Sequence, residues 1–287
     1  MTGAAASRRE GVPAAGSDEA LILPAKRNRH VAGGLRWYTR RILRRQFHAV
    51  RAISSVRTEL ESLASSDRPA MLMLTHSSWW DPLIAIDLWN RYFPKRRLSA
   101  PMHRRELERF GFFRAVGVFG IDPDEPRSLA AMRDYLQPRL SREAAGGAEV
   151  LVLTPQGALT DPRVPMRLRP GAAAIAASVP DLEVISIAIE YAFWSDRLPE
   201  VFLHAQRCPP PNANGAASTA RWHRTLQESL AEVAEALAAA VSSRDPDRFE
   251  RLDGGESAVH PVYDWWLRAT GRSGGIDGEG RARRSSR

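Results

Sequence analysis

Residues 69–93 read PAMLMLTHSSWWDPLIAIDLWNRYF, and this stretch decides the fold. The run from Met71 to Thr75 is short and apolar, which predicts a buried strand. Residues 82–93 predict a helix, because a proline suits the first helical turn and apolar residues follow it at helical spacing. A strand, a polar turn and a helix in this order are typical of a layered α/β domain, and such turns are where these domains bind ligands.

The same alternation of elements continues along the chain. Further strands are predicted at residues 98–102, 118–121, 150–154, 184–189 and 201–204. Further helices are predicted at residues 106–116, 127–140, 172–179 and 222–237. We therefore expect one α/β domain over residues 67–267, a mixed and largely parallel sheet flanked by helices.

Residues 31–66 are predicted to form a basic amphipathic helix ahead of this domain. Apolar residues recur at spacings of three, four and seven from Leu35 to Leu63. The first half is rich in arginine: Arg36, Arg40, Arg41, Arg44, Arg45 and Arg51. Such a helix can lie in the headgroup layer of an anionic membrane, or it can be a core helix with a solvated arginine face. The sequence leaves both interpretations open.

Both ends of the chain resemble disordered tails. Residues 1–30 and 268–287 are rich in glycine, alanine, serine and charge. No apolar run reaches the roughly 18–20 residues that cross a bilayer. The first residues also lack the apolar core of a secretory signal. Any membrane contact is therefore expected to be peripheral, with the protein cytoplasmic and on the inner face of the cell membrane.

The charge balance narrows the choice of partners. The net charge is +8, and of 41 lysine and arginine residues only Lys26 and Lys95 are lysine. A basic protein can bind nucleic acid or an anionic membrane. We find no zinc-finger spacing, helix-turn-helix or aromatic RNA-binding signature, so we expect no nucleic-acid partner. The single cysteine, Cys208, excludes an internal disulfide and is expected to be structural.

The polar turn carries the candidate chemistry. On a continuous helix, five steps of about 100° would place His76 and Asp81 on different faces, so the two meet only if the chain turns between them. Asp81 could then accept a hydrogen bond from one imidazole nitrogen, leaving the other to take a proton from an alcohol. In the alternative interpretation, the histidine merely ends a strand and Asp81 caps the next helix.

Histidine and aspartate at this spacing resemble the H-x-x-x-x-D motif of the glycerolipid acyltransferase superfamily, whose best-known members acylate lysophosphatidic acid. Three later segments resemble further blocks of that family in the same order: residues 117–122 (GVFGID), 154–160 (TPQGALT) and 184–188 (VISIA). The resemblance covers roughly residues 69–205. It implies a glycerolphosphate acyltransferase-like fold and an O-acyltransferase similar to 1-acylglycerol-3-phosphate acyltransferases, working in phospholipid biosynthesis.

The resemblance also implies a mechanism. A fatty acyl group would pass directly from acyl-CoA or acyl carrier protein to a lipid hydroxyl, with His76 as general base and Asp81 orienting it. Backbone amides near Asp81 or Gly157 would stabilise the oxyanion. We expect no cofactor beyond the thioester substrate, and no metal, because no carboxylates or histidines have ligand spacing. The expected partners are the acyl donor, the lipid acceptor, an anionic membrane and, as one option for the donor, acyl carrier protein.

The sequence departs from the family where the acceptor's phosphate is held. Pro123, Gln156 and Leu159 stand at positions where the family has charged residues. Either a nearby arginine such as Arg127, Arg163, Arg167 or Arg169 replaces them, or the acceptor is a lipid without phosphate, such as a glycolipid. Trp79 and Trp80 are expected to line an apolar acyl groove or to pack in the core. The predicted substrate-binding residues are Trp79, Trp80, Arg127, Gln156, Gly157 and Arg163.

Three classes of function stay open from the sequence: an acyltransferase, a catalytically drifted lipid-binding or membrane-binding protein on the same fold, and a basic nucleic-acid-binding protein. A serine hydrolase is disfavoured, because Ser77 and Ser78 lack the G-x-S-x-G turn that exposes such a nucleophile. The first class is favoured, because four segments follow the family's order on the predicted elements.

Overall fold

The computed structural model describes residues 21–144, 147–194, 196–211 and 217–254. Within these ranges the strands are β1 (Ala49–Ala52), β2 (Ala70–Leu74), β3 (Leu98–His103), β4 (Val118–Ile121), β5 (Val150–Leu153), β6 (Glu183–Ala192), β7 (Glu200–Cys208) and β8 (Glu250–Gly254). They form one eight-stranded sheet in the order β4-β3-β5-β2-β6-β7-β1-β8. The pairs β6–β7 and β1–β8 are antiparallel and the other neighbours are parallel, as predicted for a mixed, largely parallel sheet.

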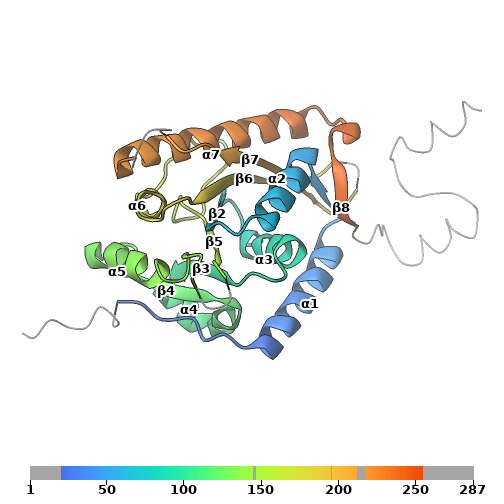
Figure 1. Cartoon of the computed structure of the whole chain (residues 1–287). Coiled ribbons are helices and arrows are strands. Elements are labelled where there is room, and N and C mark those ends of the chain that lie inside the picture. Colours follow the sequence, from blue (N-terminus) through green and yellow to red (C-terminus); the bar gives the residue numbers. More distant parts are fainter. Residues whose placement is uncertain (1–20, 145–146, 195, 212–216, 255–287) are drawn as a thin grey trace, which may run out of the picture.

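Helices cover both faces of this sheet (Figure 1). They are α1 (Arg29–Gln46), α2 (Ser54–Ser65), α3 (Asp81–Tyr92), α4 (Arg104–Arg109), α5 (Pro126–Leu136), α6 (Gly171–Ser178) and α7 (Thr219–Ser242), with short 3₁₀ helices η2 (Gly111–Val116) and η3 (Pro246–Arg248). The apolar residues of α1, α2 and α3 pack on one face, and those of α5, α6 and α7 pack on the other. No helix in the described part of the chain is long and apolar enough to span a membrane.

The central strand β2 shows why the fold forms. All five of its residues are buried, as predicted for a strand covered on both faces. Leu72 and Leu74 belong to the cluster beneath α2 and α3, whereas Met71 and Met73 belong to the cluster beneath α5 and α6. This alternation follows from the two-residue period of a strand.

The prediction of one helix over residues 31–66 is wrong. α1 ends at Gln46, and β1 follows it between β7 and β8 before α2 begins. Phe47 and Val50 are 2% and 4% exposed, so the backbone around them needs hydrogen-bond partners within the protein. Strand pairing on both edges supplies those partners. The apolar residues of α1 and α2 recur at the same spacings of three and four, so the two helices resemble one continuous helix in the sequence. The four residues of β1 between them are too few to interrupt this pattern recognisably.

The predicted N-terminal tail, residues 1–30, is wrong in its last part, because residues 21–28 pack against the domain. Leu23 forms an antiparallel bridge with Gly120 at the outer edge of β4, and Ile22 is buried beside it. Asn28 then caps α1 by accepting hydrogen bonds from the amides of residues 30 and 31. This segment covers an edge strand that would otherwise expose unpaired backbone groups. Residues 1–20 and the predicted C-terminal tail of residues 268–287 lie outside the described residues.

Two predicted helices have different bounds. The helix predicted at residues 106–116 divides at Phe110 into α4 and η2. The helix predicted at residues 127–140 ends at Leu136, two positions before Pro138, which cannot continue it. β8 was not predicted, because it adds to the sheet only through its pairing with β1.

Candidate active site

His76 and Asp81 meet in the turn between β2 and α3. The Nδ1 atom of His76 lies 2.8 Å from Oδ2 of Asp81. The same oxygen accepts hydrogen bonds of 2.9 Å from the amides of Ser77 and Ser78. The turn is therefore wrapped around the carboxylate, which is 1% exposed, while the His76 side chain is 20% exposed. The predicted contact between imidazole and carboxylate is present.

Asp81 does not act as the helix cap that the alternative interpretation required. The N-cap of α3 is Trp80, and no side chain accepts a capping hydrogen bond there. Asp81 is the first residue of the helix, and its side chain points back into the preceding turn. The carboxylate thus holds the turn and the histidine instead of the helix end.

Tyr191, near the end of β6, completes the hydrogen bonding of this carboxylate. Its hydroxyl donates a 2.6 Å hydrogen bond to Oδ1 of Asp81. Burial, followed by the negative charge of Asp81, raises the pKa of Tyr191 far above its usual value, so the hydroxyl keeps its proton and remains a donor. Tyr191 was not predicted from the sequence, because no local pattern connects positions 110 residues apart.

Gln156 holds the backbone of His76. Its Oε1 atom accepts a 2.6 Å hydrogen bond from the amide of His76, and the amide of Thr160 donates to the His76 carbonyl at 2.7 Å. Gln156 was predicted to bind substrate, but the structure places its oxygen on His76 and does not place it among the cavity-lining residues. Gly157, its neighbour, does line the cavity.

The histidine lines a cavity of about 630 Å³. Its walls come from helices on opposite faces of the sheet: Leu83 and Ile86 belong to α3, whereas Met132 and Ala172 belong to α5 and α6. Most other lining side chains are apolar, among them Leu98, Ala100, Met102, Phe110, Phe113, Val118, Ile121, Leu129, Val152 and Leu153. A cavity of this size and character fits a long apolar ligand.

A gap in the sheet explains how one cavity reaches both faces. The register of β3 with β5 covers Leu98 and Ser99, whereas residues 100–103 pair with β4. Successive strand residues turn their amides to opposite edges, and Ala100 donates toward the β4 side. Pro101 therefore faces β5 with a nitrogen that carries no hydrogen. The two strands separate at this proline, and the cavity occupies the space between them.

A family model described as acyltransferase matches residues 50–190. The chain belongs to the acyltransferase family. None of the curated proteins matches the chain. The matched region starts in β1 and ends in β6, so it contains His76, Asp81 and the residues that line the cavity. Family membership supports a lipid acyltransferase function for this chain.

The two tryptophans between His76 and Asp81 have different surroundings. Trp79 lines the cavity and is 57% exposed. The centroid of its ring lies 5.3 Å from that of Phe110. Trp80 instead packs edge-on against Phe47 at 5.1 Å, within the core cluster, and is not among the cavity-lining residues. The first tryptophan is therefore available to a ligand, and the second supports the turn.

The arginines predicted to replace the missing cationic groups also differ in their surroundings, because only some of them line the cavity. Arg163 pairs with Asp161, whose pKa it holds well below the usual range, and it is not among the cavity-lining residues. Arg127, in the first turn of α5, does not line the cavity either. Arg169 does line it. The guanidinium of Arg169 donates to the carbonyl of Pro123 at 3.2 Å, and its Cδ and Nε atoms lie beside Gly157.

Arg169 thus touches both segments in which the sequence was expected to depart from the family pattern. Its contacts are Pro123 in the first of these segments and Gly157 in the second. Arg169 also pairs with Asp124 at 3.0 Å. Among the arginines that the structure describes, Arg169 is the one that lines the cavity, and the sequence alone did not favour it over its neighbours.

The backbone amides expected to stabilise an oxyanion are already engaged. The amides of Ser77 and Ser78 donate to Asp81, and the amides of Trp80 and Asp81 donate to Ser78. The amide of Gly157 donates to the carbonyl of Thr154. These five amides would have to leave their present acceptors before they could stabilise an oxyanion.

Three possible metal-ligand side chains come together near the cavity, contrary to the expectation from spacing. His103, Asp122 and Asp124 offer ligand atoms within 4.8 Å of one another. Strand pairing brings them together, because His103 is the register partner of Ile121. Asp124 already has a cationic partner in Arg169, so the group does not require an ion.

Proposed function

We propose that the protein transfers a fatty acyl group from a thioester, acyl-CoA or acyl carrier protein, to a hydroxyl of a lipid acceptor. The observation that carries this proposal is the 2.8 Å contact between His76 and Asp81 at the wall of a large apolar cavity. An imidazole with one nitrogen fixed by a carboxylate has its other nitrogen available as a base. An apolar cavity beside it suits the chain of a fatty acyl group.

The proposed reaction is a direct displacement. The Nε2 atom of His76 takes the proton of the acceptor hydroxyl, and the oxygen forms a bond with the carbonyl carbon of the thioester. The carbon–sulfur bond then breaks, and the leaving thiolate takes the proton from Nε2. Asp81 stabilises the imidazolium between these two proton transfers. No covalent enzyme intermediate is needed.

A serine nucleophile has less support. The described residues with positive φ, other than glycines, are Asp181 and Arg244, so neither Ser77 nor Ser78 occupies the strained turn of a nucleophile elbow. The hydroxyl of Ser78 accepts a hydrogen bond from the amide of Trp80. Direct transfer to the acceptor is therefore the simpler assignment.

Arg169 is proposed to bind the acceptor's anionic group, if the acceptor is phosphorylated like lysophosphatidic acid. It is the cavity-lining arginine that touches both altered segments, and guanidinium groups bind phosphate through paired hydrogen bonds. A non-phosphorylated glycolipid would not need this charge. Comparing the two acceptors therefore tests whether Arg169 binds an anionic group.

We also propose that α1 lies against an anionic membrane. Trp37 and Tyr38 are 65% and 49% exposed, and exposed arginines accompany them on the helix. The guanidinium of Arg41 lies 5.7 Å from the ring centroid of Trp37. Aromatic and arginine side chains together are favoured in the headgroup layer. α1 packs against α3 and η2, both of which line the cavity, so acceptors could enter from the lipid side.

The experiment that tests the proposed function uses a labelled acyl-CoA, lysophosphatidic acid and a neutral glycolipid. His76→Ala is expected to abolish transfer to either acceptor. Asp81→Asn is expected to lower kcat by roughly 10²–10⁴-fold, the contribution of a general base, because the histidine would lose the group that fixes its tautomer. Circular dichroism should show that both variants remain folded. Unchanged turnover in His76→Ala would favour a lipid-binding protein without catalysis.

A further inference from the structure

We infer that Tyr191 is a positioning residue of the His76–Asp81 pair: through the hydrogen bond of its hydroxyl, it fixes the carboxylate that orients the imidazole. This inference rests on the proposed function, because it concerns the same base. It also goes beyond the family match, which ends at residue 190.

The two oxygens of Asp81 have unequal sets of partners. Oδ2 faces His76 and also accepts from the amides of Ser77 and Ser78. Oδ1 accepts from Tyr191 at 2.6 Å. Four hydrogen-bond partners therefore surround one carboxylate. Three of them come from the short turn itself, and the fourth ties that turn to β6, the strand that pairs with β2.

Tyr191 is held rigidly enough to serve this purpose. It lies in the antiparallel ladder of β6 and β7, opposite Val201. Its ring packs at 5.7 Å from that of Phe47, which in turn contacts Trp80 at 5.1 Å. The raised pKa of the Tyr191 hydroxyl keeps it protonated, and therefore a donor, at neutral pH. A rigid donor aimed at one oxygen prevents the carboxylate from rotating about its Cβ–Cγ bond.

The catalytic consequence follows from the proton transfers. When His76 takes the acceptor's proton, Asp81 must stabilise the imidazolium without removing the proton from Nδ1. A carboxylate that already accepts a hydrogen bond on Oδ1 is a weaker base toward that proton. The proton taken at Nε2 then remains available for the leaving thiolate. Tyr191 touches neither substrate in this scheme, so it acts through Asp81.

The test is Tyr191→Phe in the full-length protein, with Tyr135→Phe as the matched control. The Tyr135 hydroxyl accepts a hydrogen bond from the amide of Ala25, so the control also loses one hydroxyl contact, but away from the site. We expect Tyr191→Phe to lower kcat roughly 10- to 100-fold while KM changes less than about twofold, the range typical of groups that support a reacting side chain. Tyr135→Phe should leave both values unchanged.

A second readout does not depend on turnover. The Nδ1 proton of His76 should give a downfield resonance in ¹H NMR, identified by its disappearance in His76→Ala. In Tyr191→Phe this resonance should shift or broaden, and in Tyr135→Phe it should stay in place. An unshifted resonance, a kcat within about twofold of the parent protein, or a change confined to KM would overturn the inference. Activity that survives His76→Ala would instead refute the proposed function, so the two failures are distinguishable.

Discussion

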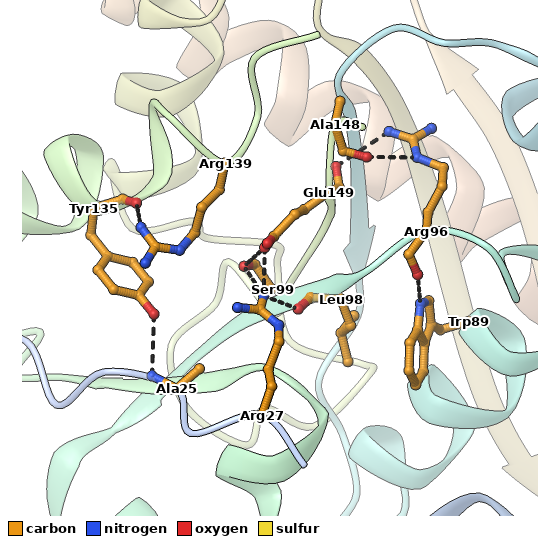
Figure 2. A network of polar contacts seen from close by, with 10 residues as sticks. All are labelled: Ala25, Arg27, Trp89, Arg96, Leu98, Ser99, Tyr135, Arg139, Ala148 and Glu149. Atoms are coloured by element: carbon orange, nitrogen blue, oxygen red, sulfur yellow. Dashed lines mark hydrogen bonds and ion pairs between the residues drawn. The ribbon is translucent and has the colours of Figure 1, made fainter. Parts of the chain in front are cut away.

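Arg27 and Glu149 form a 2.6 Å ion pair across 122 residues (Figure 2), beside Leu98 and Ser99, the two residues of β3 that pair with β5. The same guanidinium nitrogen donates to the carbonyl of Leu98 at 2.8 Å and to the hydroxyl of Ser99 at 3.4 Å. Glu149 is 3% exposed and also accepts from Ser99. The N-terminal segment is therefore fastened where the two strands begin to separate.

Arg27→Met should lower the free energy of unfolding by about 2–3 kcal/mol, because it leaves a buried carboxylate without its cation. The value is below that of a fully buried pair, since the Arg27 side chain is 30% exposed. Urea denaturation measures it. The double variant Arg27→Met with Glu149→Leu should lose less unfolding free energy than the two single variants lose in total. Strict additivity of the two substitutions would contradict a direct ion pair.

Gly157→Ala should weaken binding of a phosphorylated acceptor by displacing Arg169. Gly157 has a φ of +72°, and a Cβ atom there would lie 2.6 Å from the Cδ and Nε atoms of Arg169. We expect KM for lysophosphatidic acid to rise roughly tenfold in this variant and in Arg169→Met, the loss of about one charge-assisted hydrogen bond. KM for a neutral glycolipid should stay within about twofold in both.

Arg163→Met provides the control for that experiment, because Arg163 pairs with Asp161 and does not line the cavity. It should leave both KM values unchanged. Equal losses for the charged and neutral acceptors in Arg169→Met would show that Arg169 supports the fold instead of binding an anion.

Ala172→Leu should shorten the preferred acyl chain. Ala172 lines the cavity from the α6 side of the sheet, whereas His76 lies beyond the C-terminal end of the central strand β2. If the acyl chain passes through the gap beside Pro101, added methylene groups at residue 172 obstruct its far end. Comparing acyl-CoA donors of increasing length should show kcat/KM falling for long chains and persisting for short ones.

Ala176→Leu is the matched control, because Ala176 is buried one turn later on α6 but does not line the cavity. Either substitution can cost about 1–3 kcal/mol of stability through overpacking. Only Ala172→Leu should change the chain-length profile. The same profile in both variants would place the acyl chain elsewhere.

Replacing Trp37 and Tyr38 by alanine should weaken binding to vesicles that contain anionic phospholipid. The two rings are exposed and lie beside arginines on α1, so their loss removes apolar contact with the headgroup layer but leaves the charge attraction. The double variant Arg40→Gln with Arg41→Gln should instead weaken the charge attraction and keep the apolar contact. The binding free energy should fall by about 1 kcal/mol for each charge removed, and much of the salt dependence should disappear. Vesicle sedimentation at low and high salt distinguishes the two effects. Binding that neither double variant weakens would exclude this face.

The free energy of unfolding should fall at alkaline pH, because the buried thiol of Cys208 keeps its proton in the folded protein. Burial raises the pKa of its thiol to about 11, from an ordinary value of 9.0. Between these values the unfolded chain has released the proton while the folded chain keeps it, so stability is fully present below about pH 9 and is lost as the pH rises toward 11. The loss should reach about 2–3 kcal/mol.

Urea unfolding of the parent protein and Cys208→Ala at pH 8 and pH 10.5 isolates this effect, because every other titrating group is common to both. The parent should lose roughly 2 kcal/mol more than the variant over this interval. Parallel losses would mean that the thiol is not protected by burial.

Much of the fold follows from local patterns. The apolar run of β2, the proline at the start of α3 and the alternation of strands and helices depend on neighbouring residues, so the sequence was sufficient to predict them. The contact between His76 and Asp81 was predicted for the same reason, since a turn of five residues brings it about. The helix predicted over residues 31–66 failed, because β1 forms only when β7 and β8 lie beside it.

By itself, the sequence determined the layered α/β architecture and the imidazole–carboxylate pair at the end of its first central strand. The tertiary structure decided which distant groups complete the site: Tyr191 on Asp81, Arg169 beside Gly157, and the gap that Pro101 leaves between β3 and β5. The physical reason is that strand order sets these contacts. Hydrophobic periodicity specifies which face of each element is buried, but many arrangements of the same strands would bury those faces equally well.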